Sequence, residues 1–203
     1  LTTFNEVDMS TVMALRNQYK DQFEKRHGVK LGFMGFFVRA CIAALKDIPA
    51  VNAEIDGEDI VYKNFVNMGI AVGGPSGLVV PVIKKAQNLT LLGIAGALAD
   101  LTAKARANKL TPAEIQGGTF TISNHGVSGS LVATPIIINQ PQSAILGIGK
   151  LEKRVIVKEV EGQDTIAIRP MAYVSLTIDH RVIDGYQTNA FLSKWVEVIE
   201  GWK

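Results

Sequence analysis

The fold is decided near the end of the chain by three consecutive segments: TIAIRPMAYVSLTI (165–178), DHRVIDG (179–185) and YQTNAFLSKWVEVIE (186–200). The first is rich in β-branched and aromatic residues, which favours a strand. In the third, apolar residues recur at helical spacing from Phe191 to Ile199, with polar residues between them. We therefore predict a strand that ends in a polar turn and is followed at once by an amphipathic helix.

Outward from this stretch, helices and strands follow one another without a regular order. Helices are predicted at about 9–26 (ended by Gly28), 32–47, 91–107 and from Pro112, and strands at 66–72, 78–83, 119–123 and 143–148. Two hairpins are predicted, one centred on Asp56-Gly57 and one in which residues 161–164 join strands at 153–160 and 165–178. Because βαβ alternation is irregular and hairpins are frequent, we expect one α/β domain over residues 1–203, with a mixed sheet.

Composition excludes several classes of protein. The chain has 203 residues, 47% of them hydrophobic and 20% charged, with a net charge of +2, so neither disorder nor a broad nucleic-acid-binding surface is expected. Cys41, the single cysteine, allows no internal disulfide and no cysteine metal cluster, and no apolar run is long enough for a membrane span. The start, LTTF (1–4), has neither an initiator methionine nor a signal-peptide pattern, so we expect an excised or trimmed domain. The single cysteine fits a reducing compartment, and we expect the bacterial cytoplasm or the mitochondrial matrix.

The turn at 179–185 carries the most informative polar residues. A histidine and three charged residues at a strand end are costly to bury unless they are paired. His180 is suited to act as a general base, because Asp184 or Arg181 can fix its geometry while the imidazole takes a proton near neutral pH. The alternative is a histidine satisfied in a salt-bridged turn, which is the commoner case for so short a motif taken alone.

A second polar stretch, GGTFTISNHG (117–126), places a hydroxyl beside glycines at a strand end. Ser123 can donate a hydrogen bond to a developing oxyanion, although a polar turn after an edge strand is the commoner reading. His125 is a weaker candidate than His180 for the general base, because no carboxylate stands beside it in the sequence. A nucleophilic Ser123 is disfavoured because the Gly-x-Ser-x-Gly elbow is absent. The glycine-rich segment 73–77 also lacks the lysine of a phosphate loop.

These stretches resemble a known family. The segment 179–185 is similar to the His-x-x-x-Asp-Gly signature shared by dihydrolipoamide acyltransferases and chloramphenicol acetyltransferases. Four further segments resemble the dihydrolipoamide acyltransferases of 2-oxo acid dehydrogenase complexes in particular: GLVVPVI (77–83), FTISN (120–124), ATPII (133–137) and PQSAILG (141–147). Each segment alone is weak evidence, but together they cover essentially the whole chain in the family's order.

The resemblance implies a fold and a mechanism. The fold is the two-layer, mixed-sheet α/β fold of chloramphenicol acetyltransferase, the coenzyme A-dependent acyltransferase fold. The family's active sites lie between neighbouring subunits of a trimer, with coenzyme A as a substrate and a lipoyl group carried on a separate domain. By position, His180 is the base that deprotonates the attacking thiol, Ser123 of the facing subunit stabilises the oxyanion, and Asp184 supports them. No metal is implied.

The acyl group is a finer question. TFNEVDM (3–9) and KLGFM (30–34) look most like the succinyltransferases of 2-oxoglutarate dehydrogenase complexes. The segment IIINQP (136–141) departs from that pattern in two ways. A proline generally stands at the Gln140 position, and the segment has one apolar residue more than the pattern of the succinyltransferases. The alternatives are an acetyltransferase of the pyruvate dehydrogenase complex, an antibiotic acetyltransferase, which PQSAILG disfavours, and a catalytically silent structural core.

The resemblance also implies partners. Trimers of the family assemble into cores of 24 or 60 subunits, which associate with decarboxylase and dihydrolipoamide dehydrogenase components. The lipoyl and peripheral-subunit-binding domains that normally precede the catalytic domain are absent from this chain, as is the leucine-rich ending expected after Trp202. No nucleic acid and no membrane is expected among the partners.

Overall fold

The computed structural model describes residues 1–75 and 77–202, so Ser76 of the glycine-rich segment and Lys203 lie outside it. Its helices are α1 (Ser10–His27), α2 (Phe33–Asp47), α3 (Leu91–Arg106), α4 (Pro112–Ile115), α5 (Gly185–Glu200) and three 3-10 turns, Pro49–Asn52, Ala86–Asn88 and Gly126–Ser128. Its strands are β1 (Thr2–Asp8), β2 (Ala53–Asp56), β3 (Asp59–Tyr62), β4 (Met68–Ile70), β5 (Val72–Gly74), β6 (Gly77–Val79), β7 (Val82–Ile83), β8 (Phe120–Asn124), β9 (Ala144–Ile148), β10 (Glu152–Val160) and β11 (Gln163–Ile178).

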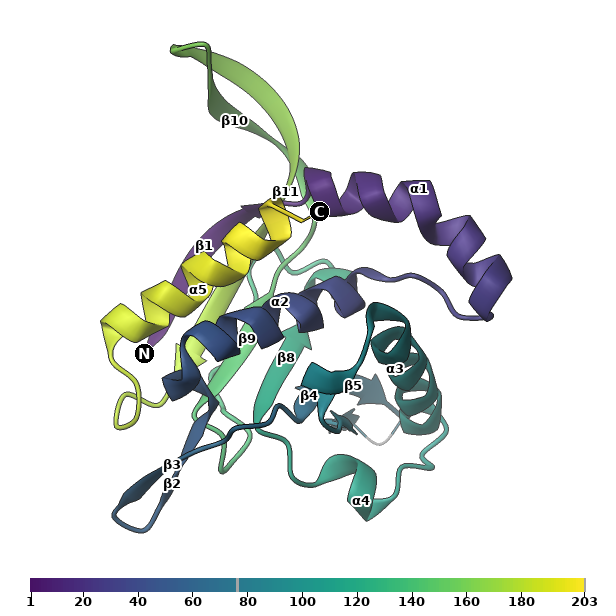
Figure 1. The fold of residues 1–203 in the computed structure, drawn as a ribbon, viewed down its shortest axis with the longest axis vertical. Helices are drawn as coiled ribbons and strands as arrows, with labels where there is room; N and C mark the ends of the chain where they lie inside the picture. Colours follow the sequence, from purple (N-terminus) through teal and green to yellow (C-terminus); the bar gives the residue numbers. More distant parts are fainter. Residues whose placement is uncertain (76, 203) are drawn as a thin grey trace.

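A mixed sheet organises the molecule (Figure 1). Its strand order is β1-β11-β9-β8-β4-β7, and β10 pairs with the protruding part of β11. Strand β8 is parallel to both β4 and β9, whereas the other neighbours in this sheet are antiparallel. The predicted mixed sheet is therefore confirmed, and the parallel strands lie at its centre.

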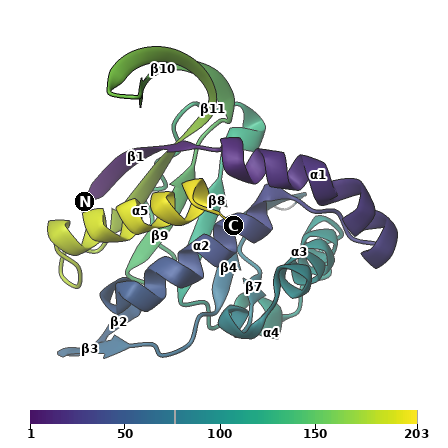
Figure 2. The same cartoon turned by 45° about the horizontal axis from the view of Figure 1, so that its top comes forward.

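Helices α2 and α5 cover one face of this sheet (Figures 1 and 2). Helix α2 buries eight of its residues, as its apolar circumference predicts, and α5 buries Trp195 and Phe191. The Phe191 ring lies 5.4 Å from that of Phe120 on β8, and the Trp195 ring lies 5.6 Å from that of Phe37 on α2. Aromatic packing thus fixes α5, and the turn before it, against the strands.

The loop that follows β8 packs closely against β9 and β11. The Ser175 hydroxyl of β11 donates to the backbone oxygen of Ala133 in this loop. A Cβ at Gly147 on β9 would lie 2.5 Å from that same oxygen and 2.6 Å from Pro135 Cδ. Glycine is required at position 147 because only a residue without a side chain lets the loop backbone approach so closely.

Two parts of the chain differ from the sequence prediction. The strands predicted at 66–72 and 78–83 are each broken, and β5 and β6 pair only with each other in a small separate sheet. The first break follows Ile70, where β4 ends, although the Ala71 N–H still donates to Ile122 O on β8. Strand β1, which was not predicted, forms the sheet edge along β11.

The β10–β11 hairpin extends beyond the body as an arm (Figure 1). The pairs Val155–Ile168 and Val157–Ile166 put four apolar side chains on one face, all of them more than 60% exposed.

No helix among the described residues is both long and apolar enough to cross a bilayer.

Candidate active site

His180 lies in the tight turn between β11 and α5. The Val182 and Ile183 N–H groups both donate to Asp179 O, at 3.0 and 3.1 Å, which folds the chain back toward the helix. The Asp179 N–H donates to Ser143 O at 2.8 Å and anchors the turn to the start of β9. His180 itself is exposed, so its imidazole is available to a group outside this subunit's own core.

A salt bridge brackets His180. Arg181 donates from Nη2 to Asp179 Oδ2 at 2.6 Å and from Nε to Asp179 Oδ1 at 3.0 Å. These bonds hold the pKa of the Asp179 carboxyl below its ordinary value, although burial of the carboxyl acts in the opposite direction. Because a bidentate pair of this kind has a fixed geometry, it restricts the backbone on both sides of His180.

Asp184 caps helix α5. Its Oδ1 accepts a hydrogen bond from the Gln187 N–H at 2.8 Å, and the Gln187 side chain accepts from the Asp184 N–H at 3.4 Å. This reciprocal pair is a capping box, which satisfies two of the free donors at the helix start. No hydrogen bond joins Asp184 to His180 within residues 1–75 and 77–202, so its contacts are those of a residue that shapes the turn.

Ser123 lies near the end of β8 and is only 6% exposed. Its Oγ is 2.9 Å from Nε2 of His125, two residues further along the chain. The Asn124 side chain accepts from the Gly126 N–H at 3.0 Å, and the His125 N–H donates to Ile148 O at 3.0 Å. These bonds hold the turn that folds the His125 ring back onto the serine.

Ser123 and His125 line a cavity of about 940 Å³. Its walls come from four separate parts of the chain: the end of α1 with the connection to α2, residues 70–73 with Leu78, one side of α3, and the end of β8 with the loop that follows it. Lys30 and Arg106 line it as cations, and most of the remaining wall is apolar. Neither cation stands out in the sequence, since only folding brings these distant segments together.

Within one chain the structure does not bring Ser123 and His180 together. The strand registers align Ser123 with Gly147 on β9 and Gly147 with Ser175 on β11. His180 therefore stands five residues beyond the level of Ser123, or roughly 15 Å along the strand direction at about 3.3 Å per residue. The two groups lie toward opposite ends of the central strands and cannot share one substrate atom within one chain.

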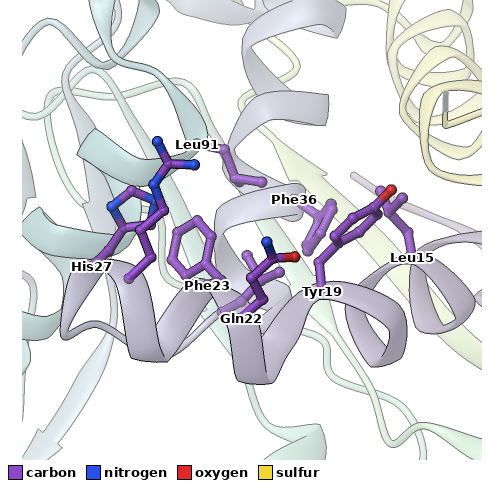
Figure 3. A pocket seen from close by; sticks show the side chains of 9 residues that line it. Leu15, Tyr19, Gln22, Phe23, His27, Phe36 and Leu91 are labelled. Carbon is purple, nitrogen blue, oxygen red and sulfur yellow. The ribbon is translucent and has the colours of Figure 1, made fainter.

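A second cavity, of about 450 Å³, lies along α1 (Figure 3). Tyr19 and Phe23 of α1 line it together with Phe36 of α2 and Leu91 at the start of α3. His27 also lines it, with its ring 5.0 Å from that of Phe23 in an edge contact. This cavity contains neither Ser123 nor His180.

Across the described part of the chain, no cluster of three or more histidine, cysteine or acidic side chains is arranged to hold a metal ion.

Comparison with protein families gives one model that covers this whole architecture. Residues 1–203 match the 2-oxoacid dehydrogenases acyltransferase (catalytic domain) family. The chain belongs to this family. Its signature turn with His180, its β8 end with Ser123 and the cavity beside it are thus parts of an acyltransferase catalytic domain, and the family predicted from the sequence motifs is confirmed.

A relative from Rickettsia bellii (strain RML369-C) is named dihydrolipoyllysine-residue succinyltransferase component of 2-oxoglutarate dehydrogenase complex. It is 58% identical over 200 residues, which are 98% of this chain and 49% of the relative. The acyltransferase chain therefore spans about half the length of that relative.

Solved structures support the fold. The cubic core of a pyruvate dehydrogenase multienzyme complex superimposes with a TM-score of 0.92 at 35% identity, over 98% of this chain and 81% of that one. A chloramphenicol acetyltransferase superimposes with a TM-score of 0.59 at 19% identity, over 98% and 87%. The second likeness concerns the fold alone, and it confirms the predicted fold class.

Proposed function

We propose that this domain transfers a succinyl group between dihydrolipoamide and coenzyme A, with His180 as general base and Ser123 as oxyanion donor. The observation that carries the proposal is the placement of these two groups. His180 is exposed in a salt-bridged turn at one end of the central strands, and the Ser123 hydroxyl lies in the wall of a cavity of about 940 Å³ at the other end. The succinyltransferase relative supports the acyl group.

The chemistry requires little beyond these groups. A free thiol has a pKa of about 8.5, so a neutral imidazole within hydrogen-bond reach can take its proton as the sulfur attacks the thioester carbonyl. The carbonyl oxygen becomes an oxyanion, which a serine hydroxyl stabilises. The sulfur of the original thioester then leaves as a thiolate and takes up the proton from the imidazolium. Exchange between two thiols is nearly thermoneutral, so alignment of the thiols and oxyanion stabilisation account for the catalysis.

The active unit is then an oligomer, and we propose a homotrimer. Ser123 and His180 meet only if the end of the sheet that carries His180 in one subunit faces the cavity of the next subunit. Exposed apolar side chains support such contacts: Ile137, in the loop after β8, is 88% exposed, and the arm exposes Ile166 to 81%. Exposed apolar patches of this kind mark protein interfaces.

The wider assembly follows from the same proposal. One structural neighbour is the cubic core of a pyruvate dehydrogenase complex, which supports assembly of the proposed trimers into a core of 24 or 60 subunits. The lipoyl group that carries the acyl chain would be borne on a separate domain. Decarboxylase and dihydrolipoamide dehydrogenase components would be the partners that load and reoxidise it.

Acyl preference tests the substrate. We expect kcat/KM for succinyl-dihydrolipoamide to exceed that for acetyl-dihydrolipoamide by at least about tenfold, roughly 1.4 kcal/mol of transition-state discrimination. A succinyl group carries a carboxylate, which is expensive to desolvate without a cation or several donors, and Lys30 and Arg106 line the cavity. A site built for that carboxylate leaves those groups unpaired when acetyl is bound.

The measurement is a comparison of the two thioesters with coenzyme A as acceptor, on the same preparation. Equal rates, or a preference for acetyl, would assign the chain to the pyruvate complex and leave the mechanism untouched. If a folded oligomer transfers neither acyl group, the chain is a catalytically silent structural core.

Subunit complementation tests the split site. In a cyclic trimer that contains both His180→Ala and Ser123→Ala protomers, one interface joins an intact His180 to an intact Ser123. With equal mixing, about three-quarters of the trimers are mixed and each has one intact site in three, so we expect about a quarter of wild-type activity. Each variant alone should remain nearly inactive.

Subunit exchange must be shown independently, for example by mass spectrometry of protomers with different isotope labels. Absence of complementation after confirmed exchange would place both residues in the same site of one chain, contrary to the sheet register.

A further inference from the structure

The hydrogen bond between Ser123 Oγ and His125 Nε2 is not used by the proposed mechanism, although both residues line the same cavity. The bond is 2.9 Å long, and Ser123 is 6% exposed, so the serine is packed into the cavity wall while the histidine lies over it from the more open side. His125 is thus the histidine that Ser123 contacts within its own chain, whereas His180 is remote.

The direction of this bond matters for an oxyanion donor. A serine hydroxyl has one proton. If Ser123 donates that proton to Nε2, no proton is left for the substrate. If Nε2–H donates to Oγ, the hydroxyl proton is free to point into the cavity, and the donated bond polarises the hydroxyl and strengthens its own donation.

We propose that His125 is a positioning residue for the transfer reaction, donating from Nε2 to Ser123 so that the Ser123 hydroxyl is aimed at the oxyanion. This inference rests on the proposed function and adds a residue to it. The histidine that acts on the thiol and the histidine that orients the serine are then different residues, which act on opposite sides of the reacting carbonyl.

The surroundings of His125 fit orientation better than base catalysis. No carboxylate makes a hydrogen bond to its ring within the described residues, whereas a histidine that activates a nucleophile normally has such a partner. The charged groups that line the cavity with it are Glu24 and Lys30, from the end of α1 and the segment after it, and Arg106 of α3. Ser123 is the side chain to which the His125 ring is bonded.

The experiment is a double-mutant cycle on the full chain in its native assembly, with succinyl-dihydrolipoamide and coenzyme A. His125→Phe keeps a ring and removes the donor, and we expect kcat to fall about tenfold with KM within twofold, because the lost orientation matters only in the transition state. His125→Gln, whose amide retains a donor, should recover most of that loss. His27→Phe makes the same chemical change on α1 (Figure 3) and should leave kcat unaltered.

The decisive variant combines His125→Phe with Ser123→Ala. If His125 acts through Ser123, the double variant has the kcat of Ser123→Ala alone within about twofold. A further tenfold loss would show that His125 acts independently of the serine and would overturn the proposal. So would wild-type kcat in His125→Phe, or a failure of His125→Gln to recover activity.

A second readout does not depend on activity. The chain has three histidines, so the imidazole nitrogens can be assigned by ¹⁵N NMR with one variant each. We expect Nε2 of His125 to carry the proton in the wild type and the tautomer populations to shift in Ser123→Ala. An Nε2 without a proton in the wild type would refute the inference even if the transferase activity is present. An inactive wild type with the expected tautomer would refute only the proposed function.

Discussion

Replacing His180 with alanine should lower acyl transfer by about 10²- to 10⁴-fold while the oligomer remains folded. Loss of a general base typically has an effect of this size. The imidazole is exposed and makes no hydrogen bond to the described part of its own chain, so its removal leaves no buried group unsatisfied. The turn keeps its own bonds, because Asp179 and Arg181 bracket the position without it.

The measurement is kcat for both transfer directions, with size-exclusion chromatography and thermal unfolding as checks on the fold. His180→Asn tests whether a hydrogen-bonding amide suffices, and it should be about as inactive as the alanine variant because it cannot accept the thiol proton near neutral pH. His27→Ala is the matched control. Near-normal kcat in a folded His180 variant would end the assignment of the base.

Long and regular elements were predictable from the sequence. Strand β11 and helix α5 differ from their predicted ranges by one or two residues at their starts, because a long apolar strand and a complete helical face leave few alternatives. Helix α1 ends at His27, and Gly28 after it has the left-handed φ of 68° that a terminating glycine adopts.

Short apolar runs were less informative. The region from Val66 to Ile83 is mostly apolar or glycine, so its pattern shows the turn at 73–77 but not the further breaks after Ile70 and Val79. Its division is set by tertiary partners: Ile70 donates to Pro81 O, and the next residue, Ala71, donates to Ile122 O on β8. Strand β1 was missed because Asn5, Glu6 and Asp8 are weak strand formers, and its pairing with β11 joins segments that are far apart in the sequence.

The site was predictable only as separate parts. The motifs singled out His180, Ser123 and Asp184, but Asp184 serves the chain as a helix cap, a role that its position before an amphipathic helix also allows. The sequence placed His125 near Ser123 without showing the contact, because side chains two residues apart meet only when the backbone between them turns. The roles of these residues in catalysis stay predictions.

Replacing Ser123 with alanine should lower kcat by about 10²- to 10³-fold with little change in KM. The hydroxyl would bind the oxygen strongly only when it bears negative charge, so its loss affects the transition state rather than the bound substrate. The variant removes one buried hydroxyl whose hydrogen-bond partner, His125, is exposed and can turn to water, so the fold should be little changed.

Steady-state kinetics over a range of both substrates provides the measurement, with Ser130→Ala in the exposed loop after β8 as a serine control. A variant that raises only KM would give Ser123 a binding role. A burst of free thiol from the wild type, equal to the number of sites and absent in Ser123→Ala, would instead identify an acyl-serine intermediate and contradict direct transfer.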